Sequence, residues 1–217
     1  MDGSSNLPAS TMVMMSLNKV LSKYDKIFID TAGFLIDPDS LLYPLAFREK
    51  FKSDSTEKYS NGTQKYKKSF PNLYLQEEFF LKNLYEALKK NNQKLSIPYE
   101  VIEEIKNHTT KKDKLLSSSA KNALKIIQYY KKEKLIEIYR GENYPFTDNV
   151  FITVFFRFMT KYNMCLVTQD RALGRDIAKI KTFEAIDTYK KIDAYYIYIA
   201  PNEQITLSLN KRTKTDY

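Results

Sequence analysis

The chain has 217 residues, a formal net charge of +9, and 17 Tyr and 13 Phe, which can fill a real core. This length is typical of one domain with decorations or of two small domains. No stretch approaches the roughly 20 consecutive apolar residues of a membrane span, so we expect no membrane-spanning segment. The net charge favours a polyanionic partner, with nucleic acid first and an acidic membrane or an acidic protein behind it, although many Lys-rich proteins bind nothing anionic.

The first residues lack a basic segment followed by a long apolar one, which argues against a signal peptide. Cys165 is the only cysteine and lies in the apolar run NMCLV, so we expect a reduced core residue and no disulfide framework. Together these features predict a cytoplasmic protein.

The N-terminal part of the chain predicts one helix and one central strand. Residues 1–11 are small and polar, and apolar residues at near-helical spacing then predict a helix over Met12–Tyr24. The apolar run Ile27–Ile29 is closed by Asp30 and Gly33, which is typical of a buried parallel strand. Ligands of open α/β sheets bind at the carboxyl ends of strands, so Asp30 is either a helix N-cap or part of a site.

A low-complexity segment follows a short predicted helix at Leu41–Phe51. This segment, Lys52–Asn72, has no apolar period and contains turn formers and the lysines Lys65, Lys67 and Lys68. It is either a solvated linker or a basic, Tyr-containing flap that binds a polyanion. In the second case, replacing the three lysines together would flatten the salt dependence of polyanion binding.

The remaining sequence alternates between helical and strand patterns. It predicts helices over Leu73–Lys90, from Pro98 onward, and over Ala120–Lys132, Asp148–Tyr162 and Arg171–Ile180, with strands at Lys94–Ile97, Leu135–Tyr139, Met164–Thr168 and Thr182–Ile186. AYYIYIA and QITLSL, separated by PNE, predict an antiparallel hairpin appended at the end. The fold class is therefore α/β with a mostly parallel central sheet, a helical insertion and a C-terminal hairpin.

Three further acids fall where a site at the sheet edge would need them. Helical phasing of PYEVIEEI places Glu100 and Glu103 toward solvent and Glu104 at the flank of the buried face. Asp148 precedes an apolar helix and Asp170 follows a strand, and each has an alternative role as a helix cap. Acids clustered with Asp30 at one edge would repel each other and favour a hard divalent cation, Mg²⁺ or Mn²⁺.

These acids occur in an order and in contexts that resemble the PIN-domain nucleases. The carrying motifs are Asp30 in IFIDTAGFL, Glu104 in IPYEVIEEI, Asp148 in TDNVFITVFF and Asp170 in LVTQDRAL. The resemblance implies a three-layer α/β/α fold, the four acids as catalytic residues and ligands of Mg²⁺ or Mn²⁺, and cleavage of RNA. It also implies Thr168 as a group that orients carboxylates or phosphate. Many small members are toxins, so a protein inhibitor (antitoxin) and a second copy are further partners.

The resemblance covers roughly residues 25–187 and sets the predicted domain organisation. Residues 1–24 form a tail and helix, 25–187 the PIN-like domain with an expanded segment at 37–92, and 188–217 the hairpin and tail. Ala32 departs from the family, which often has Asn or Ser two residues after the first acid. This departure keeps open a catalytically silent PIN-like module that binds RNA or a protein.

Other candidates contribute less to the predicted site. Arg171 and Arg175 lie four apart on one helix, and either contact a phosphate, which we favour for Arg171, or pair with acids such as Asp176. A haloacid-dehalogenase-like phosphatase is disfavoured because Ala32 stands where that chemistry needs an acid. His108, in KNHTTKK, is expected to be a solvated or capping residue at a helix end.

Overall fold

The computed structural model describes residues 17–36, 71–140, 147–180, 190–199 and 205–209. These residues form an α/β fold around a six-stranded sheet with the order β3-β2-β1-β4-β5-β6. All neighbouring strands are parallel except β5 and β6, which are antiparallel. The strands are β1 (Lys26–Ile29), β2 (Leu95–Pro98), β3 (Ile136–Tyr139), β4 (Met164–Thr168), β5 (Ile192–Ile199) and β6 (Ile205–Leu209).

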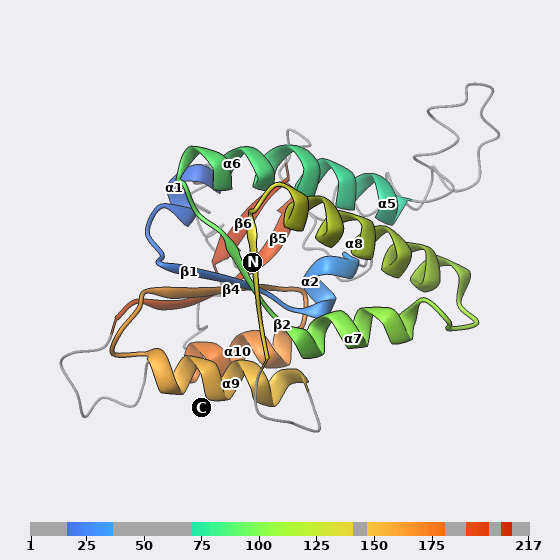
Figure 1. Ribbon diagram of the computed structural model, residues 1–217. Helices are drawn as coiled ribbons and strands as arrows, with labels where there is room; N and C mark the ends of the chain where they lie inside the picture. The colour runs from blue at the N-terminus through green and yellow to red at the C-terminus, as the bar shows by residue number, and fades with distance from the viewer. Residues whose placement is uncertain (1–16, 37–70, 141–146, 181–189, 200–204, 210–217) are drawn as a thin grey trace, which may run out of the picture.

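Helices cover the sheet from two sides, an arrangement compatible with a three-layer sandwich (Figure 1). The described helices are α1 (Leu17–Leu21), α2 (Thr31–Leu35), α5 (Pro71–Gln76), η2 (Glu77–Leu84), α6 (Tyr85–Lys90), α7 (Tyr99–His108), α8 (Lys114–Lys132), α9 (Thr147–Phe158) and α10 (Arg171–Ile180). Helices α9 and α10 pack together on one side, and the α5–η2–α6 helix and α8 lie on the other (Figure 1). Among the described helices, none combines the length and the hydropathy that a membrane span requires.

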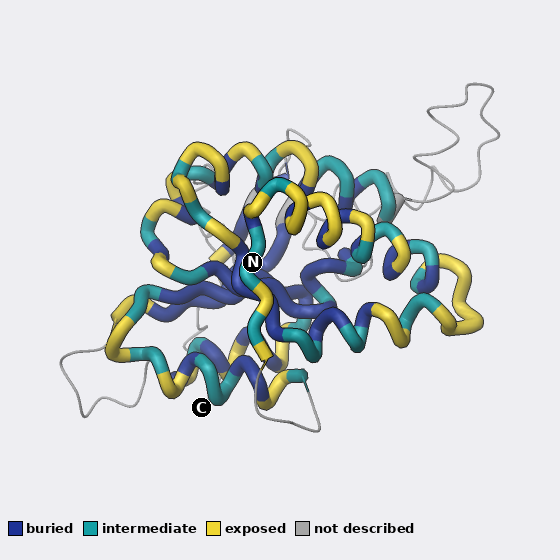
Figure 2. Tube along the Cα trace, viewed as in Figure 1, coloured by how far each residue is buried: buried dark blue, intermediate teal, exposed yellow. Residues whose placement is uncertain are grey.

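The central strands are apolar along their length because both faces of the sheet are covered. Every residue of β2 and β4 is buried, as are Ile27, Phe28 and Ile29 of β1, and Figure 2 shows this buried centre between half-exposed helices. This is the continuous apolar run expected of buried parallel strands. Cys165 is free and buried in β4, as predicted.

The strand order reverses between β1 and β4. The chain runs from β1 to β2 and β3 in one direction, and then returns to place β4 on the other side of β1. Ile29 lies opposite Val167 in the β1–β4 register, so Asp30 and Thr168 follow at adjacent strand ends. In open parallel sheets this reversal leaves a crevice at the carboxyl ends, where ligands bind.

Most described elements match the predicted ones, with shifted bounds. The bounds of β4 and α10 match the prediction, whereas α8 begins at Lys114, six residues before the predicted start, because Asp113 caps it. Helix α1 covers part of the predicted Met12–Tyr24. The helix predicted at Leu41–Phe51, the strand at Thr182–Ile186 and the first part of the Lys52–Asn72 segment lie outside the described residues.

Two segments differ from the prediction in kind. The helix predicted over Leu73–Lys90 begins at Pro71, so Pro71 and Asn72 are helical and not part of a loop, and residues Glu77–Leu84 form a π-helix within it. The predicted C-terminal hairpin forms, but it is not an appendage: β5 pairs in parallel with β4 and extends the central sheet. Strand order depends on contacts distant in sequence, which a local pattern does not encode.

Candidate active site

Asp30 lies at the end of β1 and is almost completely buried, with 4% of its surface exposed. Its Oδ1 accepts a hydrogen bond from the Gly33 N–H at 2.6 Å, and its Oδ2 accepts one from the Thr168 hydroxyl at 2.6 Å. The predicted N-cap role is therefore confirmed, because the bond to Gly33 caps α2. Both carboxylate oxygens are fixed in direction by elements that meet at the strand reversal.

The carboxyl group of Asp30 is held in an environment that disfavours its charge. Burial raises its pKa, the negative charges of Asp170 and Asp148 raise it further, and the hydrogen bonds from Thr168 and Gly33 act in the opposite direction. The result is a pKa of about 7. An acid with this pKa at the carboxyl ends of parallel strands is a candidate for a functional site.

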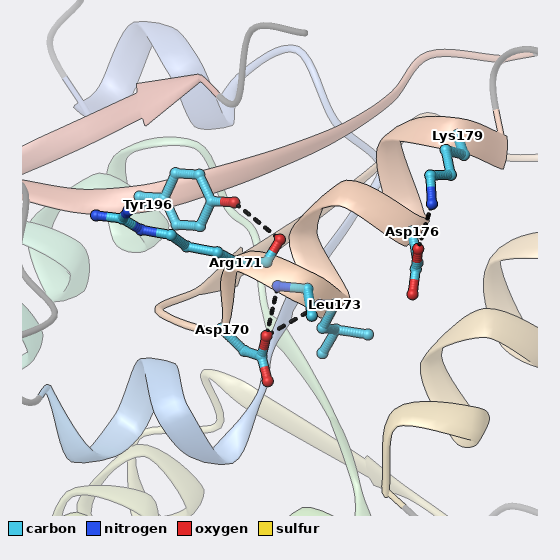
Figure 3. A network of polar contacts seen from close by, with 7 residues as sticks. Asp170, Arg171, Leu173, Asp176, Lys179 and Tyr196 are labelled. Atoms are coloured by element: carbon cyan, nitrogen blue, oxygen red, sulfur yellow. Dashed lines mark hydrogen bonds and ion pairs between the residues drawn. The ribbon is translucent and has the colours of Figure 1, made fainter. Parts of the chain in front are cut away.

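Asp170 caps α10 and also belongs to this acidic group. Its Oδ1 accepts hydrogen bonds from the N–H groups of Ala172, at 2.7 Å, and Leu173, at 3.0 Å (Figure 3). The N–H of Asp170 in turn donates to the Thr168 hydroxyl oxygen at 2.8 Å. Thr168, completely buried, therefore links the backbone of one acid to the side chain of another, Asp30.

Asp148 lies in the first turn of α9 and not at its N-cap, because the helix already begins at Thr147. Burial raises the pKa of its carboxyl group, followed by the negative charges of Asp170, Glu104 and Asp176. Asp148 thus interacts electrostatically with three other acids, two of which belong to the predicted site.

Glu104 joins the group from α7. Its Oε2 accepts a hydrogen bond from the Thr31 hydroxyl at 2.7 Å, and its Oε1 lies 3.8 Å from Nε2 of His108. Glu103, the next residue, forms an ion pair with Lys106 on the exposed side at 2.6 Å. The two glutamates therefore have different partners, although their side chains are about equally exposed, at 43% and 41%.

The helical phasing was wrong for Glu100, and the prediction for His108 was incomplete. Glu100 is only partly exposed, and its Oε2 is buried without a hydrogen-bond partner. Glu100 lies in the first turn of α7, beside the end of β3. Burial raises the pKa of the Tyr139 hydroxyl there, and the negative charge of Glu100 raises it further. His108 ends α7 as predicted, but its Nδ1 is buried and has no hydrogen-bond partner.

The donor chemistry of the group suits a hard divalent cation, but its arrangement is not a ready-made metal site. The four acids offer only carboxylate oxygens, the ligands that Mg²⁺ and Mn²⁺ prefer. Within the described ranges, no three His, Cys, Asp or Glu side chains are placed so that they could hold a metal ion together. Cation binding would therefore require these acidic side chains to move closer together.

The predicted substrate-binding residues are only partly described. Arg171 is exposed at the start of α10, where its backbone carbonyl accepts a bond from the Tyr196 hydroxyl at 3.5 Å (Figure 3). Asp176 forms an ion pair with Lys179 at 3.0 Å, so the local acid has a partner other than the two arginines. The predicted contacts of Lys65, Lys67 and Lys68 lie outside the described residues.

Three residues at the site were not singled out from the sequence. Thr31 donates a hydrogen bond to Glu104. Tyr196, from β5, packs over Gly174. Burial raises the pKa of the Tyr196 hydroxyl, and the charges of Arg171 and Arg175 lower it. Gly33 is the third: a Cβ there would lie 2.7 Å from the Val167 carbonyl oxygen and 3.0 Å from Oδ1 of Asp30. The sequence indicated Gly33 only as a turn former after the strand, and it did not predict α2 around it.

Comparison with protein-family models finds no match, and no curated protein or solved structure matches the chain significantly.

Proposed function

We propose that this protein is a PIN-like ribonuclease that hydrolyses RNA phosphodiester bonds with Mg²⁺ or Mn²⁺. The observation that carries the proposal is Asp30, buried at the strand reversal with a pKa raised by burial and by the charges of Asp170 and Asp148. A buried acid surrounded by acids is costly unless a cation compensates the charge. We infer that a cation binds there and compensates the charge of this group.

In this proposal, Asp30 and Asp148 hold the principal cation, and Glu104 and Asp170 complete the group. When bound, the cation supplies an activated water and charge stabilisation for displacement at phosphorus. Thr168 keeps the Asp30 carboxylate in place through its 2.6 Å hydrogen bond, and Thr31 restrains Glu104 in the same way at 2.7 Å. These bonds restrain two of the four acids.

The proposed substrate follows from charge and position. The net charge of +9 favours a polyanion, and Arg171 presents an exposed guanidinium one residue from Asp170. An arginine suits a phosphate because it donates two parallel hydrogen bonds. Such contacts position an RNA backbone without reading its sequence, and the lysines of the Lys52–Asn72 segment would extend them.

One observation favours the alternative function, a catalytically silent PIN-like module that binds RNA or a protein. The described acids do not form a ready-made metal-binding group. In this alternative, Asp30 acts only as the cap of α2 and Asp170 only as the cap of α10, the roles shown by their hydrogen bonds. Cation binding separates the two functions.

The decisive experiment combines Mn²⁺ binding with RNA cleavage in two variants. Asp30→Asn removes the central charge, and Glu86→Gln removes an exposed charge on α6, in the opposite helical layer. We expect wild type and Glu86→Gln to bind Mn²⁺, measured by electron paramagnetic resonance, and to cleave a labelled single-stranded RNA. Asp30→Asn should lose both properties while its circular dichroism spectrum is unchanged.

Two results would contradict the proposal. If purified Asp30→Asn cleaves RNA as wild type does, the activity belongs to another site or to a contaminant. If wild type binds RNA but neither Mn²⁺ nor Mg²⁺, the silent-module alternative is correct.

A further inference from the structure

Strand β3 ends the sheet on the side opposite to β6, and no described strand pairs with its outer edge. The N–H of Leu95 donates to the carbonyl of Leu135 at 2.9 Å, which fixes the direction of the neighbouring groups. Main-chain groups alternate in direction along a strand, so those of Glu137 face β2 and those of Ile136 and Ile138 face outward. The outer edge of β3 therefore presents donors and acceptors for another strand.

A cavity lies on each face of this edge strand. The first, of about 580 Å³, lies between the sheet and α9, and its lining includes Phe28, Glu137, Tyr139, Val154 and Phe158. The second, of about 630 Å³, lies against α7 and α8, and its lining includes Ile102, Leu124, Ile127, Ile136 and Ile138. Ile138 lines both cavities and is 38% exposed.

The charges around the two cavities are mainly positive. The cations lining them are Lys26, Arg140 and Arg157 at the first cavity and Lys106, Lys131 and Arg140 at the second. Among the described lining residues Glu137 is the only acid, and it pairs with Lys26 at 2.5 Å, while Lys106 pairs with Glu103 at 2.6 Å. The surplus of positive charge therefore comes from Arg140 and Lys131. An occupant of this edge would therefore meet a surplus of positive charge, which selects an acidic partner.

We propose that β3 binds an extended acidic segment of a partner protein, which adds a strand to the sheet. Successive side chains of an added strand point to opposite faces, so neighbouring apolar residues would enter the two cavities alternately. The outward groups of Ile136 and Ile138 would supply main-chain hydrogen bonds, and acidic flanking residues would meet the cations. Main-chain bonds give affinity in this mode, and the side-chain pockets give selectivity.

This inference is independent of the proposed nuclease activity. Two parallel neighbours, β2 and β1, separate β3 from β4, and Asp30 and Asp170 follow β1 and β4. The interaction would survive in a protein that has lost the acidic group, and RNA cleavage would survive in one that has lost the edge.

The test uses a fluorescein-labelled peptide, Glu-Glu-Val-Ile-Val-Ile-Glu-Glu, whose four apolar residues match the four residues of β3. Binding to the full chain is followed by fluorescence polarisation. Controls are the same peptide with Lys in place of Glu, and two peptides N-methylated at alternate amides, in the two registers. We expect the acidic peptide to bind saturably, the Lys peptide not to bind, and one N-methylated peptide to lose at least tenfold in affinity.

Two variants at one position separate main-chain pairing from side-chain contact. Ile138→Pro removes the outward N–H and leaves the bonds to β2, as proline on an edge strand can, whereas Ile138→Ala shortens the side chain and keeps the N–H. We expect Ile138→Pro to bind the acidic peptide roughly fivefold more weakly than Ile138→Ala, the value of one hydrogen bond. Thermal melts by circular dichroism check that both variants are folded.

Several results would overturn the inference. Absence of saturable binding, equal affinities of the two Ile138 variants, or full binding by both N-methylated peptides would exclude strand addition. If Ile138→Pro instead weakens binding of a single-stranded RNA oligomer, the edge is an RNA surface. If wild type dimerises in analytical ultracentrifugation and Ile138→Pro does not, the occupant is a second copy.

Discussion

Replacing Asp30 by Asn should stabilise the cation-free protein, and by an amount that depends on pH. The pKa of this acid rises from its ordinary 3.8 in the unfolded chain to about 7 in the folded one. Each unit of pKa is worth about 1.4 kcal/mol, so above pH 7 the ionised carboxylate costs the folded state up to about 4 kcal/mol. Below pH 3.8 the group is protonated in both states, and this cost is absent.

The sign follows from proton binding. Between pH 3.8 and about 7 the folded chain holds a proton on Asp30 that the unfolded chain has released. The contribution of Asp30 to the free energy of unfolding therefore falls as the pH rises through this window. Asn has no such dependence, and its amide oxygen keeps the bond from the Gly33 N–H. Rearranging the bond to Thr168 costs about 1 kcal/mol, so the net gain at pH 8 is about 3 kcal/mol.

Urea unfolding in EDTA, followed by circular dichroism at pH 5 and pH 8, measures this effect. The quantity of interest is the difference in unfolding free energy between Asp30→Asn and wild type, because other titrating groups cancel in it. We expect this difference to grow by at least 1 kcal/mol from pH 5 to pH 8, with the denaturant slope unchanged. A difference that is constant or shrinks would refute the argument that Asp30 is a destabilised acid.

Added Mn²⁺ should reverse the order of stability at pH 8, raising the melting temperature of wild type and not that of Asp30→Asn; equal shifts in both would place the cation elsewhere. Glu104→Gln should lose most of the RNA cleavage and Glu103→Gln should keep most of it, because Glu104 is bound by Thr31 and its charge acts on Asp148, whereas Glu103 pairs with Lys106. Cleavage rates compare the two variants, and the reverse ranking would contradict the site. Gly33→Ala should destabilise the fold by about 1–3 kcal/mol, because the added methyl group meets the Val167 carbonyl oxygen at 2.7 Å, and this backbone atom cannot move aside. Urea unfolding measures the change in unfolding free energy, and a decrease of less than about 0.5 kcal/mol would show that α2 shifts freely.

The parts of the fold that the sequence predicted well are those specified locally. The bounds of β4 matched because the apolar run Met164–Val167 is followed closely by the turn former Asp170. The start of α8 was missed because the cap, Asp113, stands among lysines and serines with little apolar periodicity. The π-helix at Glu77–Leu84 and the pairing of β5 with β4 depend on packing between distant segments, so the sequence pattern could not indicate them.

The candidate site shows the same division. Asp30 and Asp170 could be placed because turn formers follow apolar strands, and parallel strands share one carboxyl edge. Helical phase alone placed Glu100 in solvent. In the structure its Oε2 is buried, because Glu100 lies in the first turn of α7, beside the end of β3. Thr31 could not be recognised as the partner of Glu104, since their contact spans 73 residues of sequence.

The central position of β1 has a consequence for the synthesis of this chain. Asp30 is among the first site residues to be made, yet its partner Thr168 follows 138 residues later. Closing so long a loop is entropically costly until β4 is present to pair with β1. A nascent chain that ends before β4 would therefore carry Asp30, Glu104 and Asp148 without the strand that aligns them. The acidic group should thus assemble only late in translation, as one of the last events of folding.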